Sequence, residues 1–244
     1  MNERVHAAED WMMLGASEGL KRKLDMPLRF AAATALALLV ACGGGAEANG
    51  SAPTRYLEAA RWEIGPIIRG RNYSQGMPLR PTQRRDGGFH IDLPRPPGSV
   101  HYVTFPHGPL TGKTRIVMRY RVEAEPGVRI APPSSPGGPA MITLYFQRAG
   151  DTWSGRRGFE AYRWYATFAT HSPIVPGTHV MVAPLAANWT AVETSSAKTN
   201  PGAFRDALAD AERVGFVLGG GDGYGHGVFA TGRARLVVTD FRIE

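Results

Sequence analysis

Short apolar segments separated by clusters of turn residues recur along the chain from residue 62 to its end. Within them, apolar side chains alternate with polar ones or are β-branched and aromatic, which is typical of β-strands. The segments that we expect to form strands are 62–70, 88–93, 100–105, 114–122, 141–147, 162–168, 178–185, 214–219, 227–232 and 233–243. The pattern therefore predicts a protein built mainly from about ten or eleven strands.

The segment 114–122 shows the alternation most clearly. Its apolar side chains share one face of the predicted strand, and its arginines share the other. The apolar set is Ile116, Met118, Tyr120 and Val122, and the charged set is Arg115, Arg119 and Arg121. A strand that is wet on one side favours antiparallel pairing. The last segment, from Arg233 to Glu244, has a strand pattern too, and we expect it to be an integral part of a sheet.

Only residues 200–214 have the pattern of a helix. Asn200 can cap its N-terminus, and Pro201 suits the first helical position. Its apolar face consists of Phe204, Leu208 and Ala211. One helix among many strands excludes repeating βαβ units, and 30 Gly with 19 Pro favour short elements joined by turns. We therefore expect an all-β fold, a jelly-roll-like β-sandwich with one short helix.

The first forty residues have the pattern of an export signal. Basic residues precede an uninterrupted run of apolar or small residues from Phe30 to Ala41, which ends at Cys42. A membrane-spanning helix needs about 20 residues, so this run is too short to span and fits the apolar region of a signal peptide. Because residues 1–25 mix acidic and basic groups, we expect translation to begin at Met26.

The end of this run, Leu39-Val40-Ala41-Cys42, resembles the lipobox of bacterial lipoproteins. The resemblance covers this segment alone. It implies cleavage before Cys42, acylation of that cysteine and attachment to a lipid bilayer of the cell envelope, which several acyl chains would make stable. In that family an aspartate after the cysteine goes with the inner membrane, so Gly43 favours the outer membrane. The alternative is a buried N-terminal helix with a free thiol.

The predicted organisation has three parts: a signal peptide (1–41), a lipidated cysteine with a flexible tether (42–55) and a β-sandwich domain (56–244). The chain holds one cysteine, so no intrachain disulfide can form, and metal sites built from cysteines are excluded.

The chain is basic, with 28 Lys and Arg against 21 Asp and Glu and a formal net charge of +7. In the predicted mature part the basic residues are dispersed, with only the pairs Arg84-Arg85 and Arg156-Arg157 adjacent. Nucleic acid is not expected as a partner of an envelope protein. An anionic glycan or lipid headgroup fits the charge better, and solubility is the simpler interpretation.

Two glycine-containing segments look like nucleotide-binding motifs. Residues 108–114 are one residue short of a P-loop and precede a strand rather than a helix, so we expect a turn. Residues 219–227, GGGDGYGHG, also precede a strand, which excludes a dinucleotide fingerprint. In this second loop, Asp222, Tyr224 and His226 are separated by glycines, which have no side chain that would block a ligand. We take these three as candidate ligand-binding residues, beside the simpler interpretation of a connecting loop.

No cofactor, metal site or catalytic residue is predicted. His90 and Asp92 share one face of a predicted strand and could supply two metal ligands, but the spacing indicates no third ligand. A serine hydrolase would need a GxSxG motif, which the predicted mature part of the chain lacks. A glycosidase needs two converging carboxyl groups. The isolated carboxylates that could serve are Asp151, Glu160, Asp222 and Asp240.

The segment from Asp151 to Phe168 is rich in aromatic residues and arginines. A core cannot take all of these rings. On a strand from Ala161 to Ala169, alternate side chains would share a face. We assign to the core the face made by Tyr162, Trp164, Ala166 and Phe168.

The other face of this strand supplies the main binding hypothesis. Arg163 and Tyr165 are expected to be exposed there, with Trp153 on a glycine-flanked loop nearby. An aromatic ring with arginine beside it matches the apolar face and hydroxyl rim of a sugar. We expect Trp189 to lie in the core; the alternative places it beside these rings.

The strand-rich pattern, this aromatic loop and the ending GHGVFATGRARLVVTDFRIE are similar in type to jelly-roll, galactose-binding-like carbohydrate-binding modules. The resemblance implies noncatalytic glycan binding and supplies no ligand residue. Such modules can hold a structural calcium, for which this chain has no Asp-rich segment. The leading hypothesis is a lipid-anchored envelope protein whose sandwich binds a polysaccharide or another envelope glycan. The alternatives are a scaffold or assembly lipoprotein that contacts protein partners, and a polysaccharide-active enzyme.

Overall fold

The computed structural model describes residues 54–192 and 195–244. The predicted signal peptide, the lipobox with Cys42 and most of the predicted tether lie outside the described residues. The elements in chain order are η2 (Ala59–Arg61), β1 (Glu63–Gly65), β2 (Ile67–Ile68), β3 (Arg71–Asn72), β4 (Thr82–Gln83), β5 (Phe89–Asp92), β6 (His101–Pro106), β7 (Arg115–Ala124), β8 (Ile130–Ala131), β9 (Met141–Arg148), β10 (Arg163–Tyr165), α2 (Thr167–Thr170), β11 (Ser172–Pro173), β12 (Gly177–Pro184), β13 (Thr190–Ala191), α3 (Pro201–Ala209), β14 (Ala211–Gly219), β15 (Phe229–Ala230) and β16 (Ala234–Ile243).

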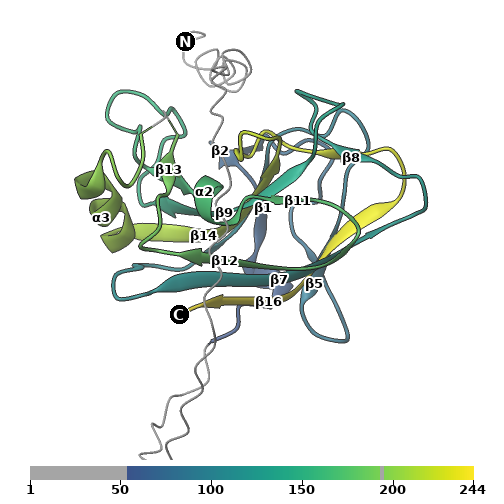
Figure 1. Cartoon of the computed structure of the whole chain (residues 1–244), viewed down its shortest axis with the longest axis horizontal. Coiled ribbons are helices and arrows are strands. Elements are labelled where there is room, and N and C mark those ends of the chain that lie inside the picture. Colours follow the sequence, from purple (N-terminus) through teal and green to yellow (C-terminus); the bar gives the residue numbers. More distant parts are fainter. Residues whose placement is uncertain (1–53, 193–194) are drawn as a thin grey trace, which may run out of the picture.

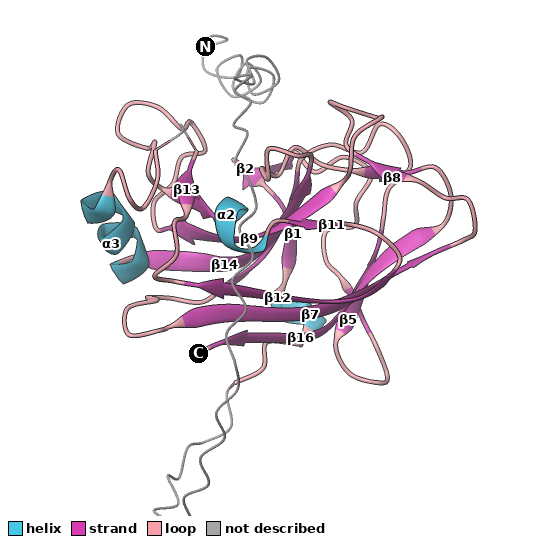
Figure 2. Ribbon diagram, viewed as in Figure 1, coloured by secondary structure: helices cyan, strands magenta, loops and turns pink. Residues whose placement is uncertain are grey.

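Most strands belong to two sheets that form two layers (Figures 1 and 2). One sheet has seven strands in the order β1-β6-β14-β9-β10-β13, with β11 beside β9. The other has five strands in the order β12-β7-β16-β5-β4. Their strand pairs are antiparallel. The predicted all-β sandwich is thus confirmed, while its jelly-roll connectivity stays a prediction.

Aromatic rings from both sheets meet around Trp62, which is fully buried. Its ring centroid lies 4.6 Å from that of Phe105 and 5.8 Å from that of Phe216, both on the seven-stranded sheet. The centroid of Phe241, on the five-stranded sheet, is 5.0 Å away. These contacts bury large apolar areas and hold the two layers together.

The predicted alternation in 114–122 is confirmed in β7, whose four apolar side chains are buried and whose Arg115 and Arg119 are exposed. The last predicted strand is confirmed as β16. It lies inside the five-stranded sheet, paired with β7 on one side and β5 on the other. The C-terminal strand is therefore the central strand of this sheet.

The helix α3 is shorter than the predicted 200–214. Asn200 does cap it, since its Oδ1 accepts a hydrogen bond from the backbone N–H of Ala203 at 3.4 Å. The chain leaves helical geometry at Asp210, and Ala211 already pairs with β9. Strand pairing within the sheet therefore overrides the helical pattern after residue 210.

The predicted strand 161–169 is also too long. β10 ends at Tyr165, and Ala166 has φ −81° and ψ 44°, outside the extended region. The alternation of faces stops at this point, and the next residues form the short helix α2. The assignment of Phe168 to the core was therefore wrong, because its side chain is 73% exposed.

Three smaller predictions can be compared with the fold. Trp189 is fully buried, as expected, and its indole Nε1 donates to the carbonyl of Pro184 at 3.0 Å. Residues 108–114 form loop and turn before β7, so the non-P-loop interpretation is confirmed. Arg55, placed in the tether, already forms a β-bridge with Arg242. Within the described ranges, no helix has the length and apolar character that crossing a membrane requires.

Candidate functional site

The outer face of the seven-stranded sheet, which points away from the core, carries a row of polar and aromatic side chains. Arg213 of β14 pairs with Gln147 of β9, which pairs with Arg163 of β10. Two residues further along these two strands, Tyr145 of β9 pairs with Tyr165 of β10. Alternation along each strand turns all of these side chains to the same side. We call these five residues the outer-face row.

Arg163 and Tyr165 lie on the face predicted for them, but the expectation that they are exposed was wrong. Both are 0% exposed. Two loops cover them, one carrying Trp153 and the other carrying Tyr224. The ring of Tyr224 meets that of Tyr165 edge-on at 4.7 Å between centroids. The strand pattern indicates which face a residue occupies, and the covering loops decide whether water reaches it.

A buried ion pair joins the first loop to the sheet. Asp151 Oδ2 lies 3.0 Å from Nε of Arg163, and both side chains are fully buried. The same oxygen accepts from Gln147 Nε2 at 2.9 Å, and Oδ1 accepts from the backbone N–H of Trp153 at 2.9 Å. Burial raises the pKa of Asp151, an effect that the neighbouring Arg163 opposes. Asp151 is thus the group that fixes the Trp153 loop on the outer-face row.

Trp153 is held in one position by its neighbours. Its backbone has φ 65°, a conformation that is uncommon for a residue other than glycine. Its ring lies 5.0 Å from Cζ of Arg163, a cation–π arrangement, and meets the ring of Tyr102 edge-on at 5.0 Å. The side chain is partly exposed. Trp153 therefore presents a fixed aromatic surface to solvent.

The phenol groups beneath the loops are neutral. Burial raises the pKa of Tyr145 and of Tyr165 well above the ordinary value of 10.0. Tyr165 and Tyr102 share a hydrogen bond of 2.8 Å between their hydroxyl groups. Within the described part of the chain, the hydroxyl of Tyr145 has no hydrogen-bond partner.

The glycine-rich loop 219–227 folds tightly back on the sheet. An added Cβ at Gly219 would overlap the carbonyl oxygen of Tyr224, and one at Gly225 would touch the ring of Tyr102. The hydroxyl of Tyr224 donates to the carbonyl of Ala191 at 3.2 Å. These close contacts explain the glycines, because larger residues would push the loop off the sheet.

Asp222 and His226 lie at the edge of this loop. Asp222 Oδ1 accepts from the backbone N–H of Tyr224 at 3.1 Å, and its Oδ2 lies 3.6 Å from Nε2 of His226. The ring centroids of Tyr224 and His226 are 6.2 Å apart. The structure thus brings Trp153, Arg163, Tyr165 and Tyr224 together. Asp222 and His226 border that group, joined to it through Tyr224.

Sequence reasoning missed Tyr102, Tyr145 and Gln147 as members of this face. The signal was available in the segments 100–105 and 141–147. In each of them, these residues alternate with apolar side chains that the structure places in the core. Two strands with aromatic and amide groups on the polar side indicate a second packed or binding surface.

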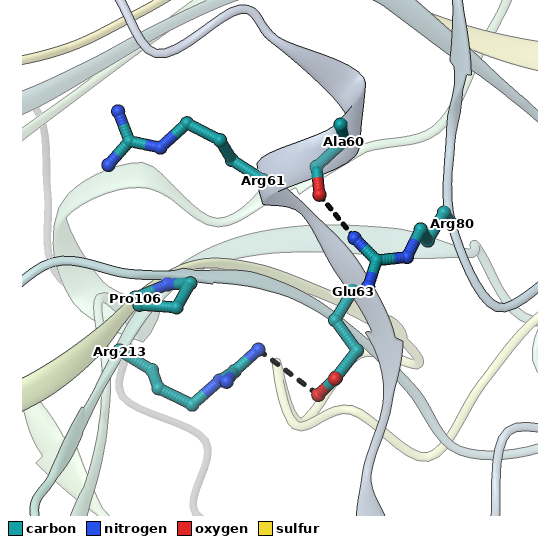
Figure 3. Close-up of a pocket in the computed structure, with 6 residues that line it drawn as sticks. All are labelled: Ala60, Arg61, Glu63, Arg80, Pro106 and Arg213. Carbon is teal, nitrogen blue, oxygen red and sulfur yellow. Dashed lines mark hydrogen bonds and ion pairs between the residues drawn. The ribbon is translucent and has the colours of Figure 1, made fainter.

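A pocket of about 260 Å³ opens beside the other end of the row (Figure 3). The residues that line it are Ala60, Arg61, Glu63, Arg80, Pro106 and Arg213. Arg213 donates from Nη2 to Glu63 at 3.1 Å and from Nε to Thr104 at 3.0 Å. Arg80 reaches in from the opposite side of Glu63 and donates to the carbonyl of Ala60. We call this site the arginine pocket.

The carboxylates considered for catalysis are dispersed over the molecule. Asp151 is engaged with Arg163, while Asp240 lies on the five-stranded sheet, 2.9 Å from Nε of Arg242. On that sheet too, Asp92 forms an ion pair with Arg235 at 3.1 Å. Among the described residues, no group of three or more His, Cys, Asp or Glu could hold a metal ion.

Comparison with known proteins adds no assignment. No model of a known protein family matches this chain, and no curated protein matches it in sequence. The features that bear on function are therefore the outer-face row, the Trp153 loop and the arginine pocket.

Proposed function

We propose that this protein is a membrane-anchored envelope lipoprotein whose β-sandwich binds a glycan without catalysing a reaction on it. The lipobox-like segment ending at Cys42 supports the anchor. The proposal for the sandwich is supported by the polar and aromatic side chains of one sheet face, whose loops carry the exposed groups.

The observation that carries the glycan proposal is the held, partly exposed ring of Trp153. A sugar offers an apolar face that stacks on such a ring and hydroxyl groups that need donors and acceptors around it. Because Asp151 and Arg163 fix the ring beforehand, little conformational entropy is lost when a ligand binds to it. Tyr224, Asp222 and His226 form the second, neighbouring loop and supply hydrogen-bonding groups.

Titration of the full-length protein with a panel of neutral and acidic oligosaccharides, followed by tryptophan fluorescence, tests the proposal. Trp62, Trp164 and Trp189 are fully buried. With Trp11 of the predicted signal peptide replaced by Phe, a ligand-dependent change is expected to come from Trp153. Trp153→Ala is expected to abolish the change and lower the affinity at least tenfold, the loss of about 1.4 kcal/mol.

Tyr73→Ala is the matched control. Tyr73 is another partly exposed ring beside a guanidinium, with Cζ of Arg71 4.7 Å from its centroid. It is expected to leave glycan affinity unchanged. If no oligosaccharide changes the fluorescence or the heat of titration, the glycan proposal is wrong.

One observation favours the scaffold alternative. β12 is an edge strand of the five-stranded sheet, and its Val180 and Val182 are 52% and 41% exposed. An exposed edge with apolar side chains can pair with a strand of another protein. Photo-crosslinking from position 182 in living cells tests this candidate, and a lack of crosslinked protein would remove it.

A further inference from the structure

We propose that the arginine pocket binds the acidic group of an anionic glycan, as a carboxylate of a uronic acid would present it. This inference rests on the proposed glycan binding and names the chemical class of the ligand.

The pocket is positively charged. Three arginines and one glutamate line it, which leaves a formal charge of +2. Guanidinium groups are charged at any physiological pH, and their paired N–H groups match the two oxygens of a carboxylate. A cluster of like charges at an open pocket is unfavourable by itself, and an anion relieves it.

Glu63 neutralises only one of these arginines. Its ion pair with Arg213 is part of a fixed arrangement in which Thr104 accepts from the same guanidinium. Among the described residues, these bonds use Nε and Nη2 of Arg213 and leave Nη1 for a ligand. Since both partners of the ion pair are partly exposed, an incoming anion can reach this nitrogen.

Arg80 supplies the other donors, while Arg61 lines the pocket with its guanidinium turned away from those of Arg80 and Arg213 (Figure 3). Cζ of Arg61 lies 5.5 Å from the centroid of Tyr56 and 5.9 Å from that of Phe105, so its planar group rests on these rings. Arg80 is exposed and is oriented by its bond to Ala60.

The pocket lies on the same sheet face as the proposed sugar-binding surface. Arg213 belongs both to the pocket and to the outer-face row, and its partner Gln147 donates to Asp151, which holds Trp153. Strands lie about 4.8 Å apart, so the pocket and Trp153 are within the length of one oligosaccharide. A chain stacked on Trp153 can place an acidic unit against the arginines.

The test compares oligogalacturonate with its methyl ester, which keeps the ring and removes the charge, on the full-length protein by titration calorimetry. The acid is expected to bind at least tenfold more tightly than the ester, and this preference is expected to fall as salt is raised to about 0.5 M. The variant Arg80→Gln is expected to remove most of the preference and leave ester binding unchanged.

Arg205→Gln, which removes an exposed arginine from α3, is the control and is expected to keep the preference. Equal affinity for acid and ester would overturn this inference while leaving the glycan proposal standing. Binding of neither compound would count against both. Arginine-dependent binding to anionic lipid vesicles without binding of oligogalacturonate would also overturn it, in favour of a lipid phosphate.

Discussion

Asp151 and Arg163 form an ion pair of 3.0 Å in which both side chains are completely buried. The pair lies outside the main core, between the outer face of a sheet and the loops that cover it. It joins β10 to the loop that carries Trp153, and so it connects the stability of the fold to the proposed binding surface.

The first prediction concerns this pair. Asp151→Asn or Arg163→Met alone leaves a buried charge without its partner, and each is expected to lower the free energy of unfolding by about 3–5 kcal/mol. The double variant removes both charges and is expected to lose less than either single variant. Urea denaturation of the four proteins measures the difference. Additive losses would mean that the two charges do not interact.

The second prediction is a pH dependence from His101. Its Nε2 donates to the carbonyl of Val228 at 3.0 Å, and its Nδ1 accepts from the hydroxyl of Ser74 at 2.9 Å. Burial lowers the pKa of His101 from 6.5 to about 4. Protonation therefore favours the unfolded state, and stability is expected to fall as pH drops from 6.5 to 4, by up to about 3 kcal/mol.

Thermal denaturation between pH 7.5 and 4 measures this loss, and His101→Gln is expected to flatten the slope. His179→Gln, on the edge strand β12, controls for removal of an imidazole. A slope that survives in His101→Gln would assign the loss to other groups.

The third prediction compares two glycines of one loop. Gly219→Ala places a methyl group on the carbonyl of Tyr224 and is expected to cost about 1–3 kcal/mol and to weaken glycan binding. At Gly221 an added Cβ meets nothing within 4 Å, so Gly221→Ala is expected to change stability by less than about 0.5 kcal/mol. Equal melting temperatures for the two variants would contradict the observed loop packing.

The fourth prediction concerns the end of the chain. A chain ending at Gly232 lacks β16, which pairs with β5 and β7 and supplies Phe241 to the contacts around Trp62. It is expected not to fold, because two neighbouring strands lose their partner and a large ring is removed from the core. A dispersed NMR spectrum from the truncated chain would refute this.

The fifth prediction tests the anchor. Cys42→Ser is expected to move the protein from the membrane fraction to the soluble fraction, because the hydroxyl group is not a substrate for the expected acylation. Mass spectrometry of the N-terminal peptide of the parent protein is expected to find acyl chains on Cys42. An unmodified cysteine would exclude the lipoprotein proposal and leave the glycan site unaffected.

Most strands could be predicted because their signal is local. In β7, apolar side chains alternate with arginines except at Val117, and this alternation predicts which face packs on the core. The predictions are wrong where hydrogen bonding between strands distant in the sequence decides the local structure. Residues 211–214 look helical beside α3 but belong to a strand, since β6 and β9 offer backbone partners there. Phe168 has the spacing of a core residue, but the strand ends three residues earlier, at Tyr165.

The candidate site was predictable only in part. Arg163 and Tyr165 were placed on the correct face, because alternation fixes the direction of a side chain. Their burial depends on the paths of two loops, which are held by contacts such as Tyr224 to Ala191 and Trp153 to Asp151. The arginine pocket joins Arg61, Arg80 and Arg213, which are far apart in the sequence and show no shared pattern.

By itself, then, the sequence determined the strand content, which face of each strand is apolar, and the lipobox-like segment, since each depends on residues that are neighbours in the chain. The tertiary structure alone decided which outward-facing groups meet water and which arginines share a pocket. Those properties arise from contacts between distant segments, and the free energy of such contacts depends on the whole fold.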